Sequence, residues 1–189
     1  MMVAVLPAGS VAVLSYGERI CGVFCIVGAT VVHAMFPHVS DLVAKQDWDG
    51  LRRMVRGSSG LIVVGSIPIV LVFWFAAEPV VRLVFERGEF TAEDTSKVAD
   101  VVMFAGLQVP GSILLTLAAR IVMAMRKNRF VVISAVVGLG ANVGLNIVFM
   151  DWFGVKGVAL STAMVNVLSA GMLFFYGWLK VREAGKNAE

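Results

Sequence analysis

Apolar residues run along the chain in five long stretches separated by short polar connections. Each stretch reaches the roughly 20 residues that a helix needs to cross the hydrocarbon core of a membrane. This pattern predicts an all-α fold, a polytopic transmembrane helix bundle of about five spans that forms a single transmembrane domain, 1–189. The spans are expected at about residues 8–36, 57–85, 97–125, 130–150 and 155–179.

Local signals predict interruptions in this pattern. Pro68 and Pro110 lie inside the second and third stretches, where a proline removes a backbone donor and favours a kink. Thr91 is a suitable N-cap for the helix that follows the second stretch, because Glu93 and Asp94 would then occupy the first turn, where the helix dipole favours negative charge.

Composition supports a membrane protein. Of the 189 residues, 59% are hydrophobic and 15% are charged, against about 45–50% and 25% in soluble domains. The formal net charge is +3, but the basic residues are spread over several connections. This distribution does not indicate a nucleic-acid surface, so we expect no nucleic-acid partner.

The distribution of basic residues predicts an orientation in the membrane. Ten of them belong to the first connection, the third connection and the C-terminal tail, against four on the opposite side. The richer set is Lys45, Arg52, Arg53, Arg56, Arg126, Lys127, Arg129, Lys180, Arg182 and Lys186. Because cytoplasmic loops carry an excess of Lys and Arg, the C-terminus is expected inside and the N-terminus outside.

Glu18 and Arg19 lie near the middle of the first span, where an ionised side chain costs at least about 2.5–3.5 kcal/mol. Such residues usually face a bundle interior or a wet cavity. One hypothesis is an anion site, with the planar guanidinium of Arg19 suited to phosphate and Glu18 orienting it. The alternative is a structural ion pair with other helices.

Two further groups are candidates for lining a cavity or for packing. Arg120 lies six residues before Arg126 and is expected to extend toward the cytoplasmic interface. His33 is expected to be a packed or interfacial residue.

Asn142 and Asn146 lie beside a GxxxG pair in the fourth span. Small residues let helices approach closely and asparagines bond across them, so helix packing is the favoured role.

The sequence offers little for catalysis. The only two cysteines, Cys21 and Cys25, lie in an apolar span without further ligands and are expected to pack. There is no GxSxG motif and no phosphate-binding glycine loop. We therefore expect no metal site, no cofactor and no enzyme activity.

Several segments together resemble one protein family. The loop "LVFERGEFTAEDT" resembles the Arg-Gly-x-Phe-Thr signature of the MurJ/MviN lipid II flippases, within the MOP exporter superfamily. The matching positions are Arg87, Gly88, Phe90, Thr91, Glu93 and Asp94. In addition, "GSVAVLSYGERI", which contains Tyr16, is similar to a family segment ending in Tyr-Ala-Asp-Arg. "MFPHVSDL" and "NVGLNIVFMDWFGVKGVALST" also match in order.

The resemblance implies a carrier in the bacterial cytoplasmic membrane. Family members move an undecaprenyl-pyrophosphate-linked peptidoglycan precursor outward by alternating access of two lobes. The resemblance also implies that Arg19 lines the central cavity and contacts the lipid-linked pyrophosphate, with membrane lipids as further partners. Glu18 departs from the aspartate that is usual in the family.

The resemblance covers only five of about fourteen family spans, all from the second lobe. We therefore expect an incomplete transporter that needs an N-terminal lobe in cis or in trans. Two alternatives remain: an exporter of another lipid-linked oligosaccharide, and a non-transporting membrane module that binds lipid or a partner protein.

Overall fold

The computed structural model of the protein describes residues 10–85 and 91–186. These residues form seven α-helices and no strand. The helices are α1 (Ser10–Ala44), α2 (Trp48–Phe75), α3 (Ala77–Phe85), α4 (Ala92–Gly106), α5 (Gln108–Ala124), α6 (Asn128–Phe153) and α7 (Val155–Lys186).

Five segments are long and apolar enough to cross a membrane. They are Val11–Ala44, Trp48–Phe75, Ala92–Ala124, Asn128–Phe153 and Val155–Ala184. The predicted helical membrane bundle is therefore confirmed. Its spans begin and end at somewhat different residues than the apolar pattern indicated, because the helices continue into polar sequence at several ends.

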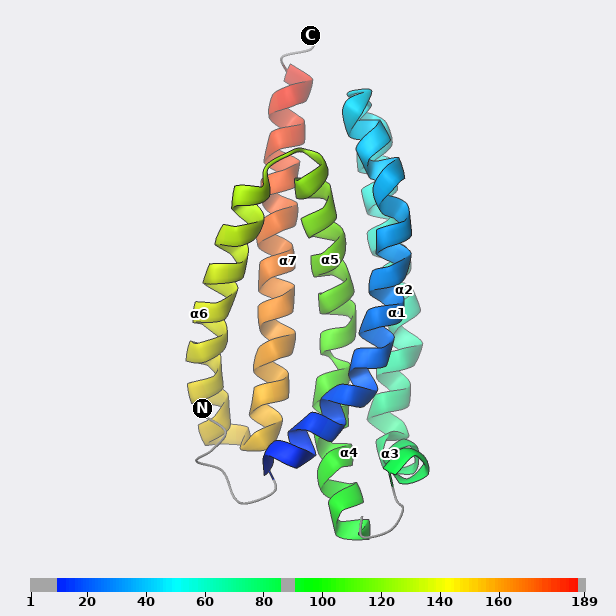
Figure 1. Ribbon diagram of the computed structural model, residues 1–189, viewed down its shortest axis with the longest axis vertical. Coiled ribbons are helices and arrows are strands. Elements are labelled where there is room, and N and C mark those ends of the chain that lie inside the picture. Colours follow the sequence, from blue (N-terminus) through cyan, green and yellow to red (C-terminus); the bar gives the residue numbers. More distant parts are fainter. Residues whose placement is uncertain (1–9, 86–90, 187–189) are drawn as a thin grey trace.

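The five segments lie side by side and alternate in direction (Figure 1). α1 rises in this view, α2 returns, α4 and α5 rise together, α6 returns and α7 rises again. The connections at residues 45–47 and 125–127 thus lie at the same end as the last turns of α7, which we call the upper end. At the opposite, lower end lie α3 and the turn at Gly154.

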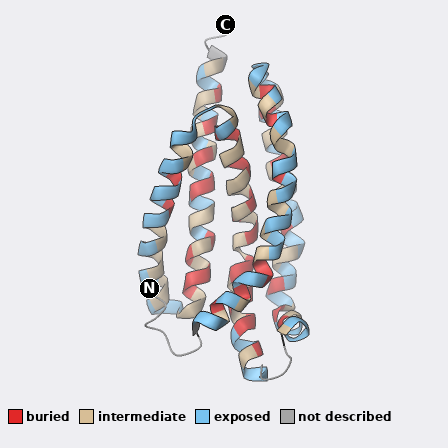
Figure 2. Ribbon diagram, in the orientation of Figure 1, coloured by how far each residue is buried: buried red, intermediate tan, exposed pale blue. Residues whose placement is uncertain are grey.

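The centre of the bundle is formed by α4, α5 and α7. In the most apolar 18-residue stretch of Ala92–Ala124, half of the residues are buried, against 11% in the corresponding stretches of α2 and α6. Figure 2 shows the same division, with buried residues concentrated on the central helices and exposed ones on the outer helices. Leu61 and Leu139, on α2 and α6, leave about 70% of their surface uncovered by protein, as expected of helices that face lipid.

The second predicted span differs most from the structure. α2 begins at Trp48, where the Asp47 carboxylate accepts a hydrogen bond of 2.8 Å from the Gly50 amide, and it passes Pro68 without a break. The helix ends at Phe75, and the remaining apolar residues form the separate helix α3. A capped helix start does not require apolar residues, so hydropathy alone placed this start nine residues too late.

The third span is interrupted near Pro110. α4 ends at Gly106 and α5 begins at Gln108, in agreement with Pro110, which has no N–H for the Gly106 carbonyl and whose ring crowds the carbonyl four residues earlier. The break also accommodates Phe73 of α2, since a Cβ at Gly106 would lie 2.8 Å from a ring carbon of that side chain.

The predicted start of α4 is confirmed. The Thr91 hydroxyl accepts a hydrogen bond from the Asp94 amide, and the Asp94 carboxylate accepts one from the Thr91 amide, which completes a capping box. The other signature positions of this loop, Arg87, Gly88 and Phe90, lie outside the described residues.

The described residues do not show the predicted GxxxG packing. Gly140 and Gly144 are exposed, and a Cβ at either would meet nothing within 4 Å. The close approach of α6 to α7 occurs instead at Gly138, where a Cβ would lie 2.9 Å from the Ser169 hydroxyl oxygen. α6 is apolar on all sides, so the glycine spacing did not reveal which face meets α7.

Candidate functional site

The charged pair of the first span lies on the open side of α1. Gly17 is buried against α4, where an added Cβ would lie 2.7 Å from a methyl carbon of Val101. Successive residues on a helix point about 100° apart, so Glu18 and Arg19 turn away from α4. Both are exposed.

The guanidinium of Arg19 lies near an aromatic ring of its own helix. Its guanidinium carbon lies 5.9 Å from the centre of the Tyr16 ring, which in turn packs at 4.8 Å between ring centres against Phe85 of α3. No ion pair joins Arg19 to Glu18 or to any other carboxylate in the described ranges. The guanidinium therefore keeps its donors available for an anion.

Arg120 is held differently. Its Nη2 lies 2.9 Å from Nε2 of His33 on α1, and its guanidinium carbon lies 5.5 Å from the centre of the Phe36 ring. Because a guanidinium can only donate hydrogen bonds, His33 is the acceptor in this contact. The sequence predicted that this side chain extends toward the interface; in the structure it crosses to α1.

Asn142 and Asn146 take part in a polar contact between α6 and α7. The side-chain amide of Asn146 donates to the Asn142 carbonyl oxygen at 2.9 Å, and the Ser161 hydroxyl of α7 donates to the Asn146 carbonyl oxygen. The predicted bonding of an asparagine across helices is therefore observed at Asn146. Asn142 also lines a groove of about 420 Å³ between α5, α6 and α7.

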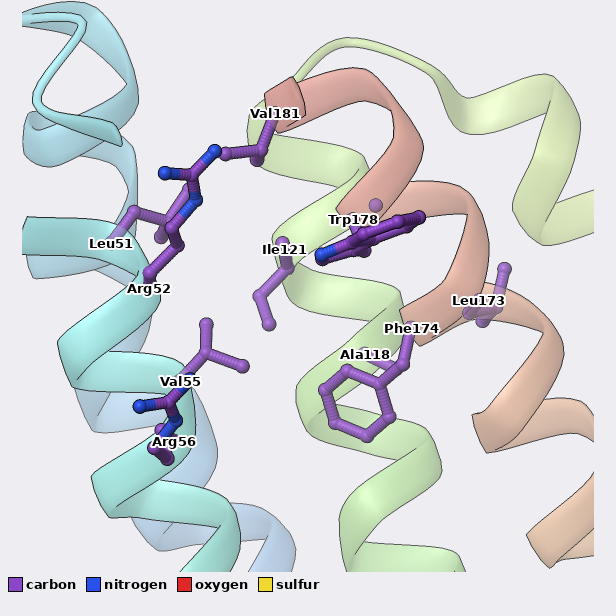
Figure 3. A pocket seen from close by; sticks show the side chains of 11 residues that line it. Leu51, Arg52, Val55, Arg56, Ala118, Ile121, Leu173, Phe174, Trp178 and Val181 are labelled. Carbon is purple, nitrogen blue, oxygen red and sulfur yellow. The ribbon is translucent and has the colours of Figure 1, made fainter. Parts of the chain in front are cut away.

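A second hollow lies near the upper end, between α2, α5 and α7, and has a volume of about 230 Å³. Figure 3 shows Arg52 and Arg56 on its α2 wall, with Ile121, Phe174 and Trp178 on the walls formed by α5 and α7. From the sequence, both arginines were interpreted only as basic residues of a connection. Their spacing of four residues puts them on one helical face and could have indicated a shared site.

The described residues contain no cluster of three or more His, Cys, Asp or Glu side chains that could hold a metal ion. Cys21 is buried beside the Val102 carbonyl, and the Cys25 sulfur lies 3.1 Å from the Ser112 hydroxyl. Both cysteines are free, and each packs against a central helix, as predicted.

The arrangement thus combines membrane-spanning helices, polar contacts between helices and, on an open face, an arginine without a carboxylate partner in residues 10–85 and 91–186. A family model described as "Lipid II flippase MurJ" matches residues 1–185 of the chain. The chain belongs to the lipid II flippase MurJ family.

Individual MurJ relatives are distant. A probable lipid II flippase MurJ of Rickettsia prowazekii (strain Madrid E) is 22% identical over 169 residues, which are 89% of this chain and 33% of the relative. That of Synechocystis sp. (strain ATCC 27184 / PCC 6803 / Kazusa) is 27% identical over 160 residues, covering 85% of this chain and 30% of the relative. The chain spans about a third of the length of the curated MurJ relatives that it matches.

The fold is that of a solved MurJ structure. A chain described as "Lipid II flippase MurJ, inward closed conformation" superposes with a TM-score of 0.74 at 21% identity. The match covers 95% of this chain and 40% of that chain. Nearly the whole fold of this chain is therefore also found within a larger MurJ protein.

Proposed function

We propose that this chain forms five consecutive membrane spans of one lobe of a lipid II flippase in the bacterial cytoplasmic membrane. The match of the MurJ family model to residues 1–185 is the observation that carries the proposal. Because alternating access requires two units that move against each other around a site, a further lobe acts with this chain, in cis or in trans. The curated relatives have ample length for such a lobe.

In this proposal Arg19 binds the pyrophosphate of the lipid-linked precursor. Its guanidinium is exposed on the open side of α1 and lacks a carboxylate partner among the described residues. Arginine presents donors in a planar fork that matches phosphate oxygens. Tyr16 supports the guanidinium from one side, and Glu18 supplies the neighbouring negative charge that tunes the site.

The other candidate residues have supporting roles in the proposal. Arg120 joins α5 to α1 through His33, so it keeps the span that carries Arg19 in place. Asn142 and Asn146 join α6 to α7. We assign these three side chains to packing within the lobe.

The proposed orientation places the upper end in the cytoplasm. The connections at that end, the first turns of α2 and α6 and the last turns of α7 together carry ten of the sixteen Lys and Arg residues, as the positive-inside rule requires of a cytoplasmic face. The N-terminus is then outside and the C-terminus inside, and the substrate moves from the upper end toward the lower end.

The proposed role of Arg19 is tested by substrate binding. We expect Arg19→Gln to weaken binding of lipid II to the purified chain by about tenfold or more, because hydrogen bonds to a charged group contribute about 1.5–3 kcal/mol. Binding is measured by titration in detergent micelles with native mass spectrometry.

Arg82→Gln is the matched control for this test. It removes one exposed arginine of α3 that already pairs with Glu78 at 3.5 Å, and it should leave binding within about twofold. Equal binding by the Arg19→Gln variant and the unchanged chain would contradict the role of Arg19. Preference for undecaprenyl pyrophosphate carrying a different glycan would favour an exporter of another oligosaccharide.

A further inference from the structure

The hollow between α2, α5 and α7 has a polar rim and an apolar interior. Its guanidinium groups come from Arg52 and Arg56 of α2. The other side chains that line it are apolar or aromatic: Leu51, Val55, Ala118, Ile121, Leu173, Phe174, Trp178 and Val181. Such a site suits a ligand with an anionic end and a hydrocarbon end.

The hollow lies at the depth of lipid headgroups. Arg52 and Arg56 belong to the first turns of α2, and Val181 belongs to the last turns of α7. The two arginines are four residues apart, or about 6 Å along the helix axis. Ala118 and Phe174 lie deeper in the spans, so an acyl chain passing from the arginines along these residues would run toward the middle of the membrane.

The charges around the hollow favour an anion. Arg52 uses one nitrogen for the Asp49 carboxylate at 3.0 Å, and the Asp49 side chain is itself 83% exposed. Arg56 has no ion pair among the described residues. A third cation lies nearby, because the Arg182 guanidinium carbon is 5.4 Å from the centre of the Trp178 ring.

From this geometry we propose that the hollow binds an anionic phospholipid. The phosphodiester accepts hydrogen bonds from Arg52 and Arg56, and the first part of one acyl chain packs on Val55, Ile121 and Phe174. The volume of about 230 Å³ is too small for a whole lipid, so the remaining chain carbons lie along the outer surface of the bundle. Basic pockets between helices at the cytoplasmic face are suited to this chemistry.

Lipid binding to the 189-residue chain in detergent micelles tests the proposal. Native mass spectrometry compares palmitoyl-oleoyl phosphatidylglycerol with palmitoyl-oleoyl phosphatidylcholine, which differ in headgroup charge. We expect a preference for the anionic lipid, and Arg52→Gln combined with Arg56→Gln should reduce its binding by about tenfold or more, because each arginine near such a headgroup contributes about fivefold.

Lys127→Gln combined with Arg129→Gln is the matched control, since it removes two exposed charges from the upper end outside the hollow. This pair should leave binding within about twofold. Equal losses in both double variants, or no loss in either, would overturn the proposal. Displacement of the lipid by millimolar glycerol 3-phosphate would also overturn it, because the site would then recognise a phosphate without its chain. The outcome does not depend on whether the chain takes part in lipid II transport.

Discussion

Arg19 and Arg120 are both arginines inside membrane spans, but their surroundings differ. Arg120 is half-buried and bonds to His33, whereas Arg19 is exposed, lies over the Tyr16 ring and has no ion pair among the described residues. A polar contact between two helices stabilises a bundle, and an exposed guanidinium without a carboxylate is available to a ligand. We therefore propose a structural role for Arg120 and a binding role for Arg19.

The structural role of Arg120 predicts an energetic coupling to His33. In a double-mutant cycle of Arg120→Ala and His33→Ala, we expect a coupling free energy of about 0.5–1.5 kcal/mol, the usual range for one hydrogen bond. Reversible unfolding in mixed micelles, followed by helical content, gives the four free energies of unfolding.

His38 provides the control cycle. It is an exposed histidine five residues further along α1, and its coupling to Arg120 should be close to zero. A coupling between Arg120 and His33 that is no larger than this control would show that the contact contributes nothing to stability.

The sequence revealed the charged residues of these sites but not their partners. Glu18 and Arg19 stood out because ionised groups are rare in a span. The partner of Arg120 lies 87 residues away in the chain, and no local spacing connects the two. Arg52 and Arg56 were visible as charges, but their pocket exists only where α2 meets α5 and α7.

At the scale of whole helices, hydropathy predicted the number of spans well and their faces poorly. The length and apolar content of each stretch suffice to predict the number of spans. Predicting which face of a helix is buried requires a polar and an apolar face, which α6 lacks, since lipid and neighbouring helices both accept apolar side chains. Gly140 and Gly144 formed the recognisable motif, yet Gly138 makes the contact with α7.

Packing of α6 on α7 can be tested with one substitution at two positions. Gly138→Leu should lower the free energy of unfolding by about 1–3 kcal/mol, because the new side chain overlaps Ser169 and Val165 of α7. Gly140→Leu places the same side chain on the open face of the same helix and should not destabilise the bundle. Chemical unfolding in micelles measures both, and equal destabilisation would contradict the assigned interface.

At the scale of the whole molecule, the chain resembles one part of a larger MurJ protein. The structural match covers 95% of this chain but only 40% of a solved MurJ chain. The outer helices α1, α2 and α6 are largely uncovered by protein, and the open side of α1 carries Glu18 and Arg19. In the proposed function, this side faces the cavity between the two lobes and contacts the substrate there.

The most direct test of this account is the rate at which lipid II reaches the outer leaflet of bacteria depleted of their own flippase. The cells express the chain with the polypeptide encoded directly upstream, or with the first lobe of the Synechocystis relative. Outer-leaflet lipid II is measured by cleavage with an added hydrolase. We predict that the unchanged chain and Arg82→Gln restore the rate, and that Arg19→Gln lowers it by about tenfold or more. Equal restoration by Arg19→Gln, or no restoration by the unchanged chain with either first lobe, would contradict the account.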